Sequence, residues 1–212
     1  MVGRDTFRPA MPGPSQPAQI SRNSNGLDQF FSSIRDRSGL SILDLAGASQ
    51  SNITFITQLG HKLYSDDILR TLSTSFGTDD EFLLRQGEPE RAEYFLKQSL
   101  DYLDDAFDGA LVWDTLQFLA PPLLQLTVDR LYRVLRPGAY LLSFFCADEK
   151  AKVIPVNSYR IQDSKTLQLA PRGETRPAQF FNNRAIERLF QNFESVKFFL
   201  TRENQREVIA RR

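Results

Sequence analysis

Short, almost wholly apolar runs that alternate with amphipathic segments constrain the fold of this chain more than any other feature. Three runs stand out: SILDLA (41–46), FDGALVWD (107–114) and AYLLSFFC (139–146). A strand that is apolar on both faces must be covered on both faces, which is typical of parallel sheets whose connections are helices. The pattern therefore predicts an α/β protein with a doubly wound, mostly parallel sheet.

The segments between these runs have helical periodicity or strand character. Apolar residues recur at helical spacing within 27–34 and 124–135, Gly60 ends a helix over 51–60, and Pro89 begins another. HKLYSDD (61–67) is interpreted as a short second strand. YFLKQSL (94–100) fits either a short third strand or the end of a helix, and we favour the helix, which would shorten that edge of the sheet.

The pattern changes after residue 146. Apolar residues alternate around Asp163-Ser164, which predicts a small hairpin. A last helix begins at Asn182 or Asn183, because asparagine is a good N-cap. SVKFFLT (195–201) and REVIARR (206–212) then predict a C-terminal antiparallel hairpin.

Residues 1–24 differ in composition from the rest. They hold four of the eleven prolines and no apolar periodicity, so we expect a disordered tail followed by one domain over 25–212. The tail lacks the apolar centre of a secretory signal, and no apolar run reaches the roughly 20 residues that cross a bilayer. We therefore expect a cytoplasmic protein that does not insert into membranes.

Charge and rare residues exclude several classes of function. Lys and Arg total 26, as do Asp and Glu, so the chain lacks the excess positive charge that drives general nucleic-acid binding. Residues 60–110 are nonetheless acidic and 150–212 basic. One cysteine, Cys146, and one histidine, His61, exclude an intramolecular disulfide and a Cys/His zinc site. No metal ligand set is expected.

The order of these parts resembles class I S-adenosylmethionine-dependent methyltransferases, over roughly residues 26–212. Four segments carry the resemblance: ILDLAGASQ (42–50), YSDD (64–67), FDGALVWDTLQFL (107–119) and LYRVLRPGAYLLSFF (131–145). The helix that ends in Arg-Pro-Gly before an apolar strand is the most specific of them. The resemblance implies a Rossmann-like fold, S-adenosylmethionine as cofactor and methyl transfer to a small-molecule acceptor.

The resemblance also implies a sharp turn after the first strand, where main chain contacts the cofactor. In the family this turn contains an acid followed by three alternate glycines. Here Asp44 is the acid, and the three glycine positions are occupied by Ala46, Ala48 and Gln50, with Gly47 between the two alanines. Small residues allow close approach of the backbone. Asp44, Ala46, Gly47 and Ala48 are therefore candidate cofactor residues in a turn of altered form.

Further cofactor contacts follow from the same resemblance. A carboxylate after the second strand would accept hydrogen bonds from both ribose hydroxyls: Asp66 fits this role best, and its neighbour Asp67 fits a helix N-cap equally well. Asp101 and Tyr102 are candidates for the adenine. Trp113 is a candidate next to the methyl group or a core residue, and Asp114 faces the methyl group or caps the next helix.

The segment 147–181 corresponds to the family's acceptor-recognising lid. Its arginines, which include Arg172 and Arg176, would suit an anionic acceptor if they lie at the site, and are otherwise solvated loop charges. No residue is identified as catalytic, and the acceptor and oligomeric state are not predicted. The altered glycine turn leaves a second interpretation, a catalytically inert methyltransferase-like binding or regulatory module.

Overall fold

The computed structural model describes residues 19–201 and 203–212. Its main sheet has six strands in the order β3-β2-β4-β5-β9-β8. In chain order these strands are β2 (Ser41–Asp44), β3 (Lys62–Ser65), β4 (Phe107–Trp113), β5 (Leu135–Cys146), β8 (Ser195–Leu200) and β9 (Gln205–Arg211). The first four run parallel, while β9 is antiparallel to both β5 and β8. The predicted mostly parallel sheet with a terminal antiparallel hairpin is confirmed.

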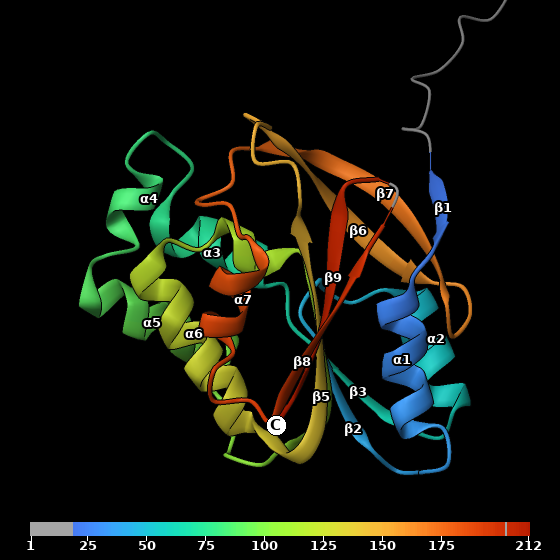
Figure 1. Ribbon diagram of the computed structural model, residues 1–212. Helices are drawn as coiled ribbons and strands as arrows, with labels where there is room; N and C mark the ends of the chain where they lie inside the picture. Colours follow the sequence, from blue (N-terminus) through green and yellow to red (C-terminus); the bar gives the residue numbers. More distant parts are fainter. Residues whose placement is uncertain (1–18, 202) are drawn as a thin grey trace, which may run out of the picture.

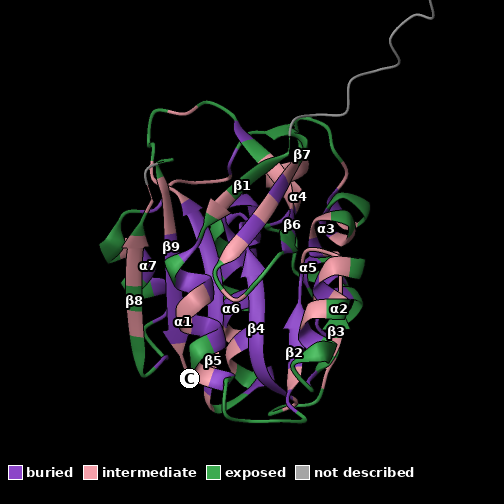
Figure 2. Cartoon of the chain, turned by 90° about the vertical axis from the view of Figure 1, so that its right-hand side faces the viewer, coloured by how far each residue is buried: buried purple, intermediate pink, exposed green. Residues whose placement is uncertain are grey.

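Helices cover the main sheet on both faces (Figure 1). On one face lie α1 (Asn25–Ile34) and α2 (Gln50–Gln58), and on the other lie α3 (Ile68–Phe76), α5 (Pro89–Ser99), α6 (Pro121–Val134) and α7 (Asn183–Leu189). Strand β4 is buried along its whole length, as Figure 2 shows for the centre of the sheet. This double coverage is the reason why the strands are apolar at nearly every position.

Residues 94–99 belong to α5, as favoured from the sequence, and not to a third strand. Pro89 is in its first turn, where the missing backbone N–H costs nothing. Strand β3 is therefore the edge of the main sheet. The short helix α4 (Phe82–Arg85) and the turns around it connect α3 to α5.

A second, antiparallel sheet lies across the carboxyl ends of the main strands on the side of α1 and α2 (Figure 1). Its strands are β1 (Ile20–Asn23), β6 (Ile154–Ile161) and β7 (Thr166–Thr175), in the order β1-β7-β6. The predicted hairpin around Asp163 is present and extends beyond the predicted residues.

The N-terminal prediction needs one correction. Residues 1–18 of the expected tail lie outside the described residues, but Ile20–Asn23 pair with β7, and Ser24 caps α1 by accepting a hydrogen bond from Leu27 N. This strand was missed because ISRN has no alternation of apolar residues. Its pairing comes from a strand nearly 150 residues away in the sequence.

Side chains of α2 close the free edge of β6 near Tyr159. The Asn52 amide donates to Tyr159 O at 3.1 Å and accepts from Ile161 N at 2.8 Å, and Ser51 Oγ donates to Ile161 O at 2.6 Å. These bonds replace those that another strand would make. They hold the small sheet in place over the main one.

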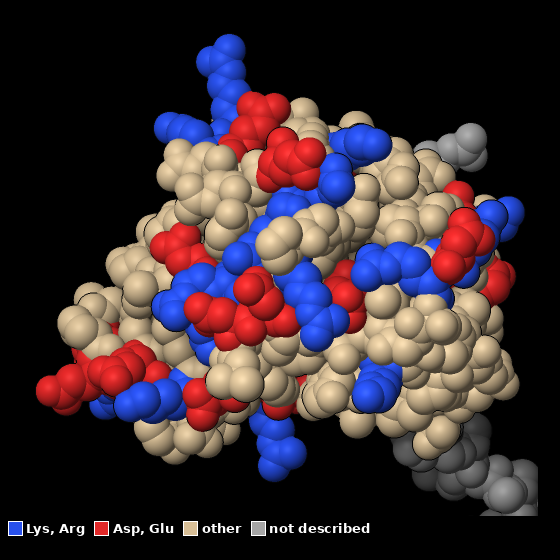
Figure 3. Space-filling model, turned by 90° about the horizontal axis from the view of Figure 1, so that it is seen from below, with Lys and Arg blue, Asp and Glu red and all other residues tan. Residues whose placement is uncertain are grey.

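No described helix is long and apolar enough to span a bilayer. On the face seen from below in Figure 3, positive and negative side chains are interspersed. Several acids of the acidic stretch 60–110 pair with arginines: Asp104 with Arg130 and Arg133, and Asp108 with Arg136. These ion pairs neutralise part of the negative charge of residues 60–110.

Candidate functional site

The turn that follows β2 lies at the carboxyl edge of the main sheet, as predicted. Asp44, the last residue of β2, is completely buried. The carboxylate accepts hydrogen bonds from Ala46 N at 3.1 Å, Asn52 Nδ2 at 2.8 Å and Trp113 Nε1 at 2.7 Å. Burial raises the pKa of Asp44, while the three hydrogen bonds oppose that rise. Asp44 therefore orders its own turn, α2 and β4 together.

The turn consists of small residues, and the N–H groups of Ala46 and Gly47 are bonded within the protein. Gly47 has φ +89°, and a Cβ there would lie 3.2 Å from Asp67 Oδ2, so both the backbone and the space favour glycine. Its N–H donates to Asp66 O at 3.0 Å. Ala48 is exposed, and the exposed Gln50 side chain bonds to Thr54 at 3.1 Å, one helical turn on. Gln50 consequently does not fill the turn.

Asp66 and Tyr102, two candidates from separate segments, are brought together. The Tyr102 hydroxyl donates a hydrogen bond to Asp66 Oδ2. Burial, then this bond to a carboxylate, raises the pKa of Tyr102 well above its usual value. Asp101 is exposed and has no described hydrogen bond to the other candidates, so the structure does not gather it into the same cluster.

Asp67 has the helix-capping role that the sequence allowed for it. It is the N-cap of α3, and its carboxylate accepts from Arg70 N at 3.0 Å. It also pairs with Arg172 of β7 at 3.1 Å. This ion pair links the small sheet to the end of β3, next to the turn of Gly47.

Trp113 is a core residue that also contacts the candidate site. It is fully buried, has φ +57°, and its ring is stacked on Tyr159 with centroids 4.8 Å apart and planes 6° apart. The stack fills the space between the end of β4 and β6. Tyr159 and Asn52 were not identified from the sequence, because nothing local distinguishes a buried tyrosine or asparagine that has a distant partner.

Asp114 follows β4 and is almost completely buried. It precedes the 3₁₀ turn Thr115–Phe118 without a side-chain capping bond, so the predicted capping hydrogen bond is absent. Burial raises the pKa of Asp114 to about 7, against weaker opposing effects of Tyr159 and Arg22. A carboxyl group that titrates near neutral pH at a strand end is characteristic of functional sites, although structural clusters also produce it.

A cleft of about 830 Å³ adjoins this edge between α3, α4 and β7. Arg70 and Arg172 line it on the side of Asp67, and Phe118 and Val156 contribute apolar surface. Its volume lies in the range of small-molecule sites.

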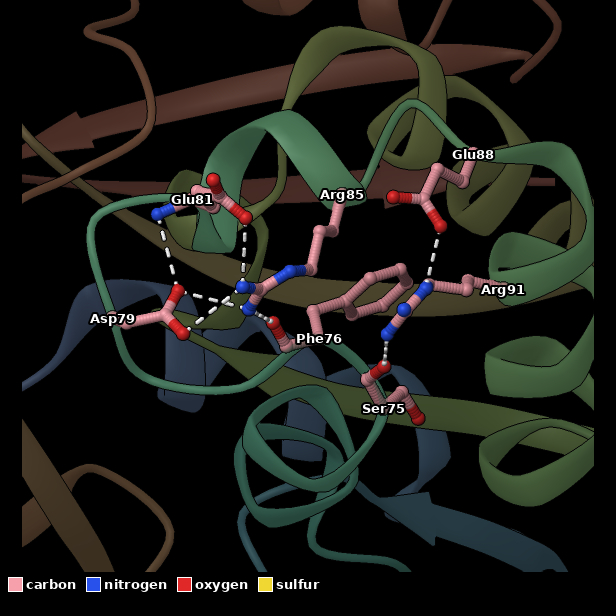
Figure 4. Close-up of polar contacts among 7 residues, drawn as sticks. All are labelled: Ser75, Phe76, Asp79, Glu81, Arg85, Glu88 and Arg91. Carbon is pink, nitrogen blue, oxygen red and sulfur yellow. Dashed lines mark hydrogen bonds and ion pairs between the residues drawn. The ribbon is translucent and has the colours of Figure 1, made fainter.

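The outer wall of the cleft is a loop held by Arg85 (Figure 4). The guanidinium donates to Phe76 O at 2.9 Å and pairs with Asp79 at 2.8 Å and Glu81 at 2.9 Å. Arg91 similarly bonds Glu88 and the carbonyl of Ser75. These bonds fix the loop that connects α3 and α5.

The residues present fit part of S-adenosylmethionine. Asp66 is half-buried and already accepts a hydrogen bond from a hydroxyl, as it would from a ribose. Ala46, Gly47 and Ala48 are small enough for a ligand to approach the turn closely. Asp44 is buried and occupied by three donors, so it can order the turn but not receive a ligand group directly. The donor set thus suits the nucleoside through Asp66 and the turn.

No family model matches the chain, and no curated protein matches its sequence. Solved structures do match its fold. A S-adenosylmethionine-dependent methyltransferase from Archaeoglobus fulgidus superposes with a TM-score of 0.52 at 11% identity, covering 88% of this chain and 91% of the other. The 4+2 cyclase SpnF gives 0.50 at 13% identity, covering 88% and 80%.

A Burkholderia thailandensis 1,6-didemethyltoxoflavin-N1-methyltransferase, solved with 1,6-didemethyltoxoflavin and S-adenosylhomocysteine, gives a TM-score of 0.49 at 15% identity, covering 88% and 76%. At these identities the likeness concerns the fold. The predicted Rossmann-like fold is confirmed. Because one neighbour is named for a cyclisation, activity has to be argued from the site.

Proposed function

We propose that this chain is a S-adenosylmethionine-dependent methyltransferase that acts on a small-molecule acceptor. One observation carries the proposal: Asp66, Tyr102 and the turn of Gly47 come from three segments and meet at the carboxyl edge of the parallel sheet. Ligands of open α/β sheets bind at this edge. Asp66 would hold the ribose, Tyr102 would flank the adenine, and Ala46–Ala48 would contact the cofactor through main chain.

The cofactor supplies a methyl group on a sulfonium, which is a strongly activated donor. The protein's contribution is then mainly to position the acceptor and exclude water. Trp113 and Tyr159 would exclude water, since both are buried at the end of β4.

Isothermal titration with S-adenosylhomocysteine tests cofactor binding directly. The Tyr102 hydroxyl occupies one acceptor position of Asp66 and so competes with a ribose hydroxyl for Oδ2. We expect Tyr102→Phe to bind S-adenosylhomocysteine about fivefold more tightly, the equivalent of a bond of about 1 kcal/mol, and Asp66→Asn to bind more weakly. Tyr94→Phe, on the exposed face of α5, is the matched control. Absence of heat at millimolar ligand for both wild type and Tyr102→Phe would contradict the proposal.

A second function, an inert binding or regulatory module, is favoured by a different observation. Asp44, Asp66 and Asp67 all have partners within the protein. Restoring glycine at positions 46, 48 and 50 separates the two functions. Binding that appears only in the triple variant Ala46→Gly, Ala48→Gly, Gln50→Gly supports the inert module, whereas equal binding by wild type supports the enzyme.

A further inference from the structure

A second hollow, of about 560 Å³, lies between the segments 149–152 and 176–180. Three cationic side chains line it, those of Lys150, Lys152 and Arg176, against one carboxylate, Glu149. None of these four side chains has an ion-pair partner among residues 19–201 and 203–212. The hollow therefore has an excess of positive charge that no described ion pair compensates.

The hollow is fixed over the carboxyl ends of β4 and β5. Ala178 N donates to Gln117 O at 2.9 Å, and Gln117 Oε1 in turn accepts from Cys146 N, the last residue of β5, at 2.9 Å. Phe181 packs against Phe145 of β5 with ring centroids 4.9 Å apart. The loop that carries Arg176 is thus anchored to β5 and to the 3₁₀ turn Thr115–Phe118 that follows β4.

Arg176 lines both this hollow and the larger cleft, so the two spaces adjoin at this residue. In the larger cleft, three arginines face three acids, so its lining has no net charge. Two of these charges already have partners: Arg172 pairs with Asp67, and Asp79 pairs with Arg85. The cleft's apolar lining consists of Leu69, Leu72, Phe82, Leu83, Phe118 and Val156.

We propose that these two spaces form one site for an amphipathic anion, whose apolar body lies in the larger cleft and whose carboxylate or phosphate head binds Arg176, Lys150 and Lys152. Guanidinium groups bind both kinds of head through paired hydrogen bonds, and ammonium groups add charge. Under the proposed function this molecule would be the methyl acceptor. Only this identification rests on the proposed function. The binding itself requires no cofactor.

Isothermal titration with two simple probes tests the site: octanoate, which has a carboxylate head, and octyl phosphate. Octanol is the neutral control. We expect at least one anion to bind at least tenfold more tightly than octanol, and Arg176→Gln to weaken that binding at least tenfold. Arg184→Gln, an exposed arginine on α7 outside both spaces, should change it less than twofold. The more tightly bound probe identifies the head group.

Two results would overturn the inference: no binding of either anion at millimolar concentration, or equal binding by wild type and Arg176→Gln. The Lys150→Gln, Lys152→Gln double variant checks the head-group site independently, with loss of affinity expected for the anions but not for octanol. A parallel titration with S-adenosylhomocysteine keeps the two proposals apart. Anion binding without cofactor binding refutes the proposed enzyme alone, and cofactor binding without anion binding refutes this site alone.

Discussion

Asp44 is the residue on which the most separate parts of the fold depend. It joins its own turn to Asn52 of α2 and to Trp113 of β4. The sequence predicts its place, since an acid that interrupts an apolar run at a strand end stands out. Its partner Trp113 could not be predicted, because 69 positions separate the two residues and only the pairing of β2 with β4 brings them together.

The bond between Asp44 and Trp113 can be measured by a double-mutant cycle. Trp113→Phe leaves a buried carboxylate without one of its donors, and Asp44→Asn removes the charge that this donor stabilises. We expect a coupling of about 1–3 kcal/mol in the free energy of unfolding, from urea denaturation followed by circular dichroism. Additive effects of the two substitutions would mean that the bond contributes nothing to stability.

The raised pKa of Asp114 predicts how the free energy of unfolding depends on pH. Its pKa is raised to about 7 in the fold, so between about pH 4 and 7 the folded protein holds a proton that the unfolded chain has lost. Stability should therefore fall as pH rises through this window, by about 1.4 kcal/mol per pH unit, and level off above it. In Asp114→Asn this contribution is absent.

The comparison uses urea denaturation of both proteins from pH 4 to 8. Burial also raises the pKa values of Asp44 and Glu207, but both groups are present in either protein and cancel in the difference. Parallel pH profiles for wild type and Asp114→Asn would show that Asp114 is ionised in the fold throughout this range.

At the scale of elements, the sequence predicts the strands of the main sheet and the helices that cover it. It predicts the small sheet only in part. Apolar runs locate β2, β4 and β5 because both faces of these strands are buried, and helical spacing locates α6 because one of its faces is buried. The turn after β2, proposed to contact the cofactor, was predicted from the family resemblance. Strand β1 depends on pairing with the distant β7, and the loop held by Arg85 depends on polar bonds. Neither leaves a periodic pattern in the sequence.

The loop between α3 and α5 yields a prediction about local order. Arg85→Ala removes the bonds to Phe76 O, Asp79 and Glu81. Exposed ion pairs contribute little, so the free energy of unfolding should change by less than about 1 kcal/mol. Hydrogen exchange of residues 77–85 should nevertheless become at least tenfold faster. Lys97→Ala, which breaks an exposed ion pair with Glu93 inside α5, should leave that exchange unchanged. Unchanged exchange in Arg85→Ala would show that the loop is ordered without Arg85.

At the scale of the whole molecule, the first and last described strands stabilise each other. Arg22 of β1 lies 3.5 Å from Glu207 of β9, and both side chains are buried. The same carboxylate accepts a hydrogen bond from Gly26 N at 2.7 Å, at the start of α1. Removing β1 would thus leave a buried acid without its cation.

Two truncated chains test this dependence. A chain that begins at Gln19 keeps every described contact, whereas one that begins at Ser24 loses β1. We expect the shorter chain to be less stable by at least about 3 kcal/mol in urea denaturation. Arg22→Met in the longer chain separates the ion pair from the strand pairing. Equal stability of the two chains would mean that β1 does not contribute to the fold.

The stacked pair of Trp113 and Tyr159 has a practical consequence. Trp113 is the single tryptophan of the sequence, and its indole lies where β4, α2 and the small sheet converge. The tryptophan fluorescence of this protein, excited at a wavelength that tyrosine does not absorb, therefore arises from one location and reports on its surroundings alone. A change in emission on adding a small molecule would signal movement at the strand ends without any attached dye.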